Sequence, residues 1–442
     1  MSDVPQPEDP DRPEEPSGSS PVGGGSPVPE AGGLPFPGSG GLPFPGAGGL
    51  PFDLGNLDVS SLMGMLHSVG PVNWEVARQV ADAASQAEGP APEIAAADRE
   101  QLEELARAAQ TLVVAETGLA STFSVDVRML TPRDWARLHL DALRPVLEAL
   151  ATTIGRAMES ADADLAAEEL PPGALPEGLQ GFEMLAGMLG VLAPLLLGVQ
   201  AGSLVGYLAQ HALGRYDLPL PAADAPSLGF VVANIDAFES AWELRREDLR
   251  FYLAIHEVVH AAQRSVPWVR ERLVALAREY VVGYDFDNAA LEEQLGSFDP
   301  SDPASIGRLT EHPEQLLGAM RSDAQREVVA RFQVFTATLE GYADSVIERI
   351  STRLIPSFAQ IHEAMKRHRL ERGEAERFVE GLLGLKLDRE HYERGDRFAA
   401  GVVERAGADG LNRLWTDPRL LPTPAELDAP GLWLARIDLP EQ

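Results

Sequence analysis

The chain has 442 residues, a formal net charge of −32 at pH 7, 45% hydrophobic residues and no cysteine. So large a negative charge argues against a nucleic-acid partner and against an anionic membrane surface, because both need a basic protein face. Without thiols the chain forms neither disulfides nor thiolate metal sites, so any zinc would be held by histidine, aspartate or glutamate.

Residues 1–58 are rich in proline and glycine and carry nine acidic residues against one arginine. Such a segment buries too little apolar surface to offset its chain entropy, which predicts a disordered acidic tail. Its start lacks the basic residues and the apolar run of a secretory signal, so we expect a cytoplasmic protein. GLPF recurs at 33–36, 41–44 and 49–52. The repeats either recruit a protein partner or only lengthen the tail.

Apolar residues at helical spacing dominate the chain from 60 to 440, and no interior linker is evident. We therefore expect one large, mainly α-helical domain with at most a few short strands. Thr131 and Pro132 give a helix start, and Pro145 is expected to kink or divide that helix. The main predicted elements are helices at 72–87, 99–117, 131–158, 239–266 and 322–351, a strand at 227–236 and a loop at 295–318.

Residues 184–214 form a long run without a charged side chain. Length alone would allow a membrane helix. However, Glu183 gives an acidic flank, basic anchors are missing, and Pro194 and several glycines interrupt the run. We expect a closely packed pair of glycine- and alanine-rich helices in a protein core, with membrane association as the alternative.

The stretch YLAIHEVVHAAQ at 252–263 contains His256, Glu257 and His260. Residues four apart share a helix face, so the two imidazoles can bind one zinc ion. Glu257 lies about 100° around the helix from His256, where it can act as a base on a metal-activated water. A metzincin would have its third histidine at the position of Val266, so the third ligand must come from elsewhere.

The best third ligand lies in TLEGYADSV at 338–346. Glu340 borders the apolar face of its helix, and Asp344 shares that face and can accept a hydrogen bond from the outer nitrogen of a ligand histidine. Alternatively, both carboxylates are solvated helix charges. His312, in the predicted loop, could also approach the site. Two histidines and one carboxylate would leave a position for water, which is the arrangement of a catalytic zinc site.

These motifs and several further stretches are similar to those of one protein family. The stretches are GPVNWEVARQVA (70–81), GYLAQHALGRYDLPLP (206–221), FVVANIDAFESAWELRREDLRFYLAIHEVVHAAQ (230–263), LEGYADSV (339–346) and GLLGLKLDREHYERGDRF (381–398). On these residues the chain resembles the zincin-like metallopeptidase type 2 family of actinobacteria. The resemblance implies a helical zincin-like fold with His256, His260 and Glu340 as zinc ligands and Glu257 as the base. Tyr342 stands where members often have histidine.

The leading hypothesis is a cytoplasmic, Zn²⁺-dependent hydrolase of peptide or amide bonds in which Glu257 moves the proton. The alternative is a non-catalytic, zinc-stabilised scaffold whose N-terminal tail recruits a partner. His362 and His368 are six residues apart and share no helix face, so we interpret them as surface residues. Hydrolysis also needs a donor to the oxyanion. The conceivable donors are Arg331, His312 and Tyr342.

Overall fold

The structure is a computed structural model that describes residues 70–87, 89–119, 126–167, 177–222, 225–283, 323–370 and 388–439. All of these residues belong to one compact unit within residues 42–442. The predicted tail at 1–58 and the predicted loop at 295–318, with His312, lie outside the described residues.

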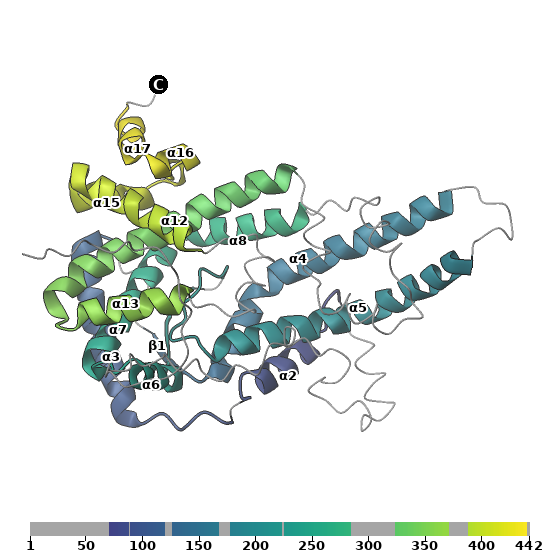
Figure 1. Cartoon of the computed structure of the whole chain (residues 1–442), viewed down its shortest axis with the longest axis horizontal. Helices are drawn as coiled ribbons and strands as arrows, with labels where there is room; N and C mark the ends of the chain where they lie inside the picture. The colour runs from purple at the N-terminus through teal and green to yellow at the C-terminus, as the bar shows by residue number, and fades with distance from the viewer. Residues whose placement is uncertain are drawn as a thin grey trace, which may run out of the picture. The chain divides into compact units, whose positions relative to one another are not determined.

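The described part is helical apart from two short strands, which confirms the predicted mainly α-helical class (Figure 1). Strand β1 (Val127–Leu130) pairs in parallel with β2 (Leu228–Val231). The longer helices are α2 (Trp74–Ala84), α3 (Ala96–Thr117), α4 (Pro132–Ala167), α5 (Glu177–Ala209), α6 (Val232–Ala241), α7 (Arg246–Ser265), α8 (Pro267–Val282), α12 (Asp323–Leu354), α13 (Phe358–Leu370) and α15 (Arg389–Asn412). The chain then forms η1 (Arg413–Trp415), η2 (Pro418–Leu420), α16 (Pro424–Asp428) and α17 (Pro430–Ile437).

Helix α5 lies against both α2 and α4 (Figure 1). It is one continuous helix with Pro194 inside it, so the predicted pair of helices is wrong. A proline removes one helical hydrogen bond, but the helix can continue beyond it. The predicted close packing is present: a β-carbon at Gly202 would collide with the carbonyl oxygen of Ala77 on α2. Among the described residues, every helix is too short or too polar to cross a lipid bilayer.

Helix α4 begins as the sequence predicts. The hydroxyl of Thr131 accepts a hydrogen bond from the amide of Asp134 at 3.1 Å, and the Asp134 carboxylate accepts one from the amide of Thr131 at 3.1 Å. Pro145 lies within a single continuous helix and does not divide it. The reciprocal cap fixes where the chain turns from β1 into α4.

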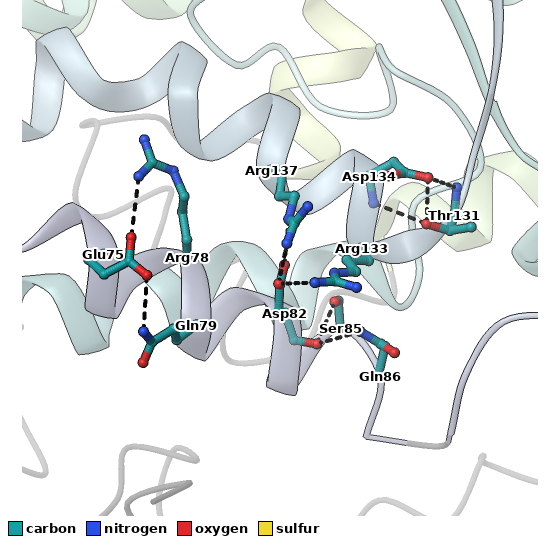
Figure 2. A network of polar contacts seen from close by, with 10 residues as sticks. All are labelled: Glu75, Arg78, Gln79, Asp82, Ser85, Gln86, Thr131, Arg133, Asp134 and Arg137. Atoms are coloured by element: carbon teal, nitrogen blue, oxygen red, sulfur yellow. Dashed lines mark hydrogen bonds and ion pairs between the residues drawn. The ribbon is translucent and has the colours of Figure 1, made fainter.

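Asp82 on α2 joins that helix to the start of α4 (Figure 2). Its carboxylate accepts hydrogen bonds from Arg133 Nη2 at 2.6 Å and from Arg137 Nε at 2.8 Å. Burial raises the pKa of Asp82, but the hydrogen bonds from Arg137 and Arg133 outweigh burial and hold this pKa below its usual value. The carboxylate therefore stabilises the contact in its charged form.

We expect Asp82→Asn to lower the free energy of unfolding by about 0.5–1 kcal/mol at pH 7, a small value because both arginines are nearly half exposed. A carboxyl with a lowered pKa stabilises the fold above its ordinary pKa and stops doing so as the pH falls through the folded value. The difference between wild type and variant should therefore shrink below the ordinary pKa of 3.8. Urea unfolding across this range measures it, with the exposed Glu75→Gln as control. A difference independent of pH would contradict the ion-pair explanation.

The segment around β2 is divided differently from the prediction. The predicted strand at 227–236 ends at Val231, and α6 follows directly. The predicted long helix at 239–266 is interrupted by a turn between α6 and α7, where Glu243 has a φ of 51°. This left-handed conformation cannot continue a right-handed helix, so α7 starts anew.

Helix α7 is the central helix of the described part and packs against α3, α8, α12 and α13. Every residue from Tyr252 to Arg264 on it is buried. Helix α15 crosses α12 at Gly341 and Gly395, where a β-carbon on either glycine would collide with the backbone of the other helix. This crossing places the TLEGYAD stretch of α12 between α7 and α15.

Candidate metal centre

The two histidines of the HEVVH stretch share one face of α7. Residue His256 is 2% exposed, and His260 is fully buried. Their ring centroids lie 4.5 Å apart, with the ring planes inclined at 61°. The spacing therefore brings the two imidazoles together, as the sequence predicts.

Glu340 reaches the centre of the protein from the second helix, α12, and is 4% exposed. Gln263 Nε2 on α7 donates a hydrogen bond to the carbonyl oxygen of Leu339 at 2.9 Å, which joins the two helices one residue before Glu340. Burial raises the pKa of Glu340, while the positive charge of Arg369 opposes this effect. The alternative of a solvated helix charge is therefore wrong for Glu340.

Glu257 is 1% exposed, and its carboxylate is held by three backbone amides. Its Oε1 accepts a hydrogen bond from the amide of Tyr216 at 3.0 Å. Its Oε2 accepts from the amides of Arg215 at 3.1 Å and Gly229 at 3.4 Å. We call these three amides the amide cradle. Sequence reasoning missed it, because the three residues come from β2 and from the segment after α5.

Helix α4 holds the segment 214–216, which carries two of the cradle amides, from its other side. Trp135 Nε1 donates a hydrogen bond to the carbonyl oxygen of Gly214 at 2.8 Å. His139 Nε2 lies 3.1 Å from the carbonyl oxygen of Arg215. A β-carbon at Gly214 would collide with the Glu257 carboxylate, so glycine is required for this close approach. The cradle is therefore fixed on both sides.

Arg264 lies one helical turn after His260 and is 2% exposed. Its Nη1 lies 3.1 Å from His260 Nδ1, and its guanidinium stacks 4.6 Å from the ring centroid of Tyr216. Burial and the neighbouring His256 and Arg264 hold the pKa of His260 well below its usual range, while the Gln263 side chain opposes them. Sequence reasoning assigned no role to Arg264 or Gln263.

Asp344 lies on the same helix as Glu340 but is paired with a different partner from the predicted one. Arg369 Nη1 donates a hydrogen bond to Asp344 Oδ2 at 2.7 Å. Burial raises the pKa of Asp344, but the charge of Arg369 and its hydrogen bond outweigh burial and lower it. The hydrogen bond that Asp344 would accept from the outer nitrogen of a ligand histidine stays a prediction.

Helix α13 carries His368 next to Arg369, and His368 contacts a second buried carboxylate, that of Asp217. His368 Nε2 lies 3.4 Å from Asp217 Oδ2, and its side chain is 23% exposed, so it is half-buried rather than a fully exposed surface residue. Asp217 Oδ2 also accepts a hydrogen bond from the amide of Leu213 at 2.6 Å. These contacts join α13 to the segment after α5, a tertiary pairing that no local spacing encodes.

Two of the conceivable oxyanion donors point to other partners. The hydroxyl of Tyr342 donates to Asn412 Oδ1 at 2.7 Å. Arg331 Nη2 lies 3.2 Å from Glu279 Oε2 on α8. Both residues therefore make contacts outside the HEVVH site.

The donor atoms fit a divalent cation in chemical type. Three buried atoms of the site have no hydrogen-bond partner among the described residues: His256 Nδ1, His260 Nε2 and Glu340 Oε1. Buried polar atoms are rarely left unsatisfied, and imidazole nitrogen and carboxylate oxygen are ligands that zinc accepts. Among the described residues, no three histidine or acidic side chains lie close enough together to hold one metal ion. The side chains of His256, His260 and Glu340 must therefore turn toward one another to bind the same ion.

The fold and the site define a helical protein of the HExxH class, with a buried acidic side chain from a second helix beside the motif. The chain belongs to the zincin-like metallopeptidase family, whose model matches residues 72–434. A crystal structure described as "a putative hydrolase with a novel fold" from Chloroflexus aurantiacus is similar, with 27% identity over 84% of this chain and 100% of that chain and a TM-score of 0.57. Comparison with curated proteins finds no match.

Proposed function

We propose that the protein is a zinc-dependent hydrolase of peptide or amide bonds, with His256, His260 and Glu340 as zinc ligands and Glu257 as the proton acceptor. The carrying observation is the set of buried donor atoms on the two histidines and Glu340 that have no partner among the described residues, in a chain of the zincin-like metallopeptidase family. Bound zinc would supply Lewis-acid polarisation of a carbonyl and a lowered pKa for water.

Glu257 can accept a proton although three amides already bind it. A carboxylate offers about four acceptor positions, two on each oxygen. Oε2 receives two amide hydrogen bonds, whereas Oε1 receives only that of Tyr216. Oε1 is also the oxygen nearer His256, 3.6 Å from its Nδ1 and beyond hydrogen-bond distance. The free position on Oε1 can therefore take a proton from water and return it to the leaving amine.

The amide cradle also orients this base. Donors on both oxygens leave the carboxylate one preferred rotation, so little orientational freedom is lost when a substrate binds. Arg264 is a buried cation beside the same histidine pair, and its Nη2 has no hydrogen-bond partner among the described residues. It is a better candidate donor to a developing oxyanion than Arg331 or Tyr342, which are engaged elsewhere.

A second candidate function is the non-catalytic, zinc-stabilised scaffold. It is favoured by the burial of the site, since none of His256, Glu257, His260 and Glu340 is more than 4% exposed. It is also favoured by the cradle, because a carboxylate with three amide partners can serve as a structural anchor. A structural zinc site, however, ordinarily has four protein ligands.

Metal analysis of ligand variants tests the proposal. We expect His260→Asn and Glu340→Gln each to weaken zinc binding at least about tenfold, because each removes one donor from a three-residue site. Matched controls are His362→Asn on α13 and the exposed Glu348→Gln on α12, which should bind zinc like the wild type. Unchanged zinc binding in both ligand variants would contradict the ligand assignment.

A peptide-cleavage assay distinguishes the zinc-dependent hydrolase from the non-catalytic scaffold. The purified full chain should cleave members of a peptide library, lose this activity after chelation, and regain it when zinc is added back. Stoichiometric zinc with four protein ligands and no cleavage would favour the scaffold.

A further inference from the structure

The hydrogen bond between Arg264 and His260 determines which ring nitrogen carries the proton. A guanidinium can only donate, so His260 Nδ1, at 3.1 Å from Arg264 Nη1, must accept. A neutral imidazole has one N–H, which then sits on Nε2. That atom is buried and has no partner among the described residues.

Zinc ligation at His260 Nε2 requires the opposite arrangement. The metal needs the lone pair of Nε2, so the remaining ring proton must move to Nδ1. A protonated Nδ1 is itself a donor and cannot accept from Arg264. Zinc at Nε2 and the observed Arg264–His260 hydrogen bond therefore exclude each other.

Gln263 carries an acceptor that suits the zinc-bound arrangement. Its side chain is fully buried, and its Nε2 is fixed by the 2.9 Å hydrogen bond to Leu339 O, which turns Oε1 away from that carbonyl. This Oε1 has no hydrogen-bond partner among the described residues. Residues three apart are neighbours on a helix face, so Gln263 is placed on α7 to reach the His260 ring.

We propose that Gln263 and Arg264 exchange places at His260 Nδ1: Arg264 donates to this atom in the metal-free protein, and Gln263 accepts from it when zinc is bound. Gln263 is then a positioning residue for the ligand, and Arg264 restrains metal uptake. The inference rests on the proposed zinc site. Stacking on Tyr216 keeps the displaced guanidinium beside the site.

Two variants of Gln263 isolate its acceptor. Gln263→Leu and Gln263→Glu both lose the donor to Leu339 O, but only the glutamate keeps an acceptor for Nδ1–H. We expect the leucine variant to bind zinc about 10–100-fold more weakly, and the glutamate variant to bind it at least as tightly as wild type. Competition titration with a zinc chelator measures both. An equal loss in the two variants would show a merely structural role and overturn the assignment of Gln263.

Arg264→Met removes the competing donor while keeping a long side chain over Tyr216. We expect zinc affinity to rise about tenfold, since the metal no longer has to break a charge-assisted hydrogen bond. A residue that only supported the fold would give a loss instead. Unchanged or weaker zinc binding in this variant would overturn the role of Arg264.

The position of the His260 proton gives a readout that does not depend on activity. Nitrogen-15 NMR of histidine side chains should show His260 protonated at Nε2 in the metal-free chain and at Nδ1 after zinc chloride is added. Zinc binding with the proton still on Nε2 would overturn this inference alone. Absence of any zinc binding by the wild type would overturn the proposed function and this inference together.

Discussion

Glu257→Gln is expected to lower hydrolysis by about 10²–10⁴-fold and the free energy of unfolding by about 1–3 kcal/mol. The first effect follows because a neutral amide cannot take up the proton of water. The second follows from the amide cradle. Whichever way the glutamine amide turns, its NH₂ group faces a backbone donor, either that of Tyr216 or those of Arg215 and Gly229. At least one buried donor then loses its hydrogen bond to this side chain.

The two effects are measured separately, as kcat/KM on a cleaved peptide and as urea unfolding at fixed zinc concentration. The exposed Glu271→Gln on α8 is the matched control and should change neither quantity. Glu257→Asp keeps a carboxylate but withdraws it by one methylene group, so it should lose both properties in part. Wild-type turnover together with lower stability would show that Glu257 anchors the cradle and is not the base. Unchanged stability would contradict the cradle.

The sequence predicted those parts of the site that lie on one helix face. The four-residue spacing of His256 and His260 brings their rings together, and the apolar face of α12 predicted that Glu340 is buried. The same spacing rule could have found Gln263 and Arg264, three and four residues after His260. They lie outside the HExxH pattern because neither an amide nor a guanidinium side chain is a usual zinc ligand.

The remaining contacts depend on tertiary structure. The amide cradle joins α7 to two segments distant in sequence, and its donors are backbone groups, which carry no residue-type signal. The partner of Asp344 could not be predicted because Arg369 comes from another helix, α13. The turn at Glu243 overrode a helical pattern, because a left-handed residue is set by packing rather than by apolar periodicity.

The crossing of α12 and α15 connects the fold to the candidate metal centre. Gly341 directly follows Glu340, and its α-carbon faces the backbone of Gly395 so closely that a β-carbon would collide with it. Backbone atoms cannot rotate away as the end of a flexible side chain can. An added methyl group must therefore push the two helices apart or turn α12, and either movement displaces Glu340.

Gly341→Ala is expected to lower the free energy of unfolding by about 3 kcal/mol or more, the upper end of the range for overpacking, and to weaken zinc binding as well. Gly155→Ala on α4 is the matched control: its β-carbon would meet no atom within 4 Å, and its position is exposed. There alanine should raise stability by about 0.5–1 kcal/mol, because it has the higher helix propensity. The same substitution in two helices thus has opposite expected signs in urea unfolding. A gain in stability for Gly341→Ala would contradict the close crossing. Unaltered zinc affinity would show that the crossing does not position the proposed ligand Glu340.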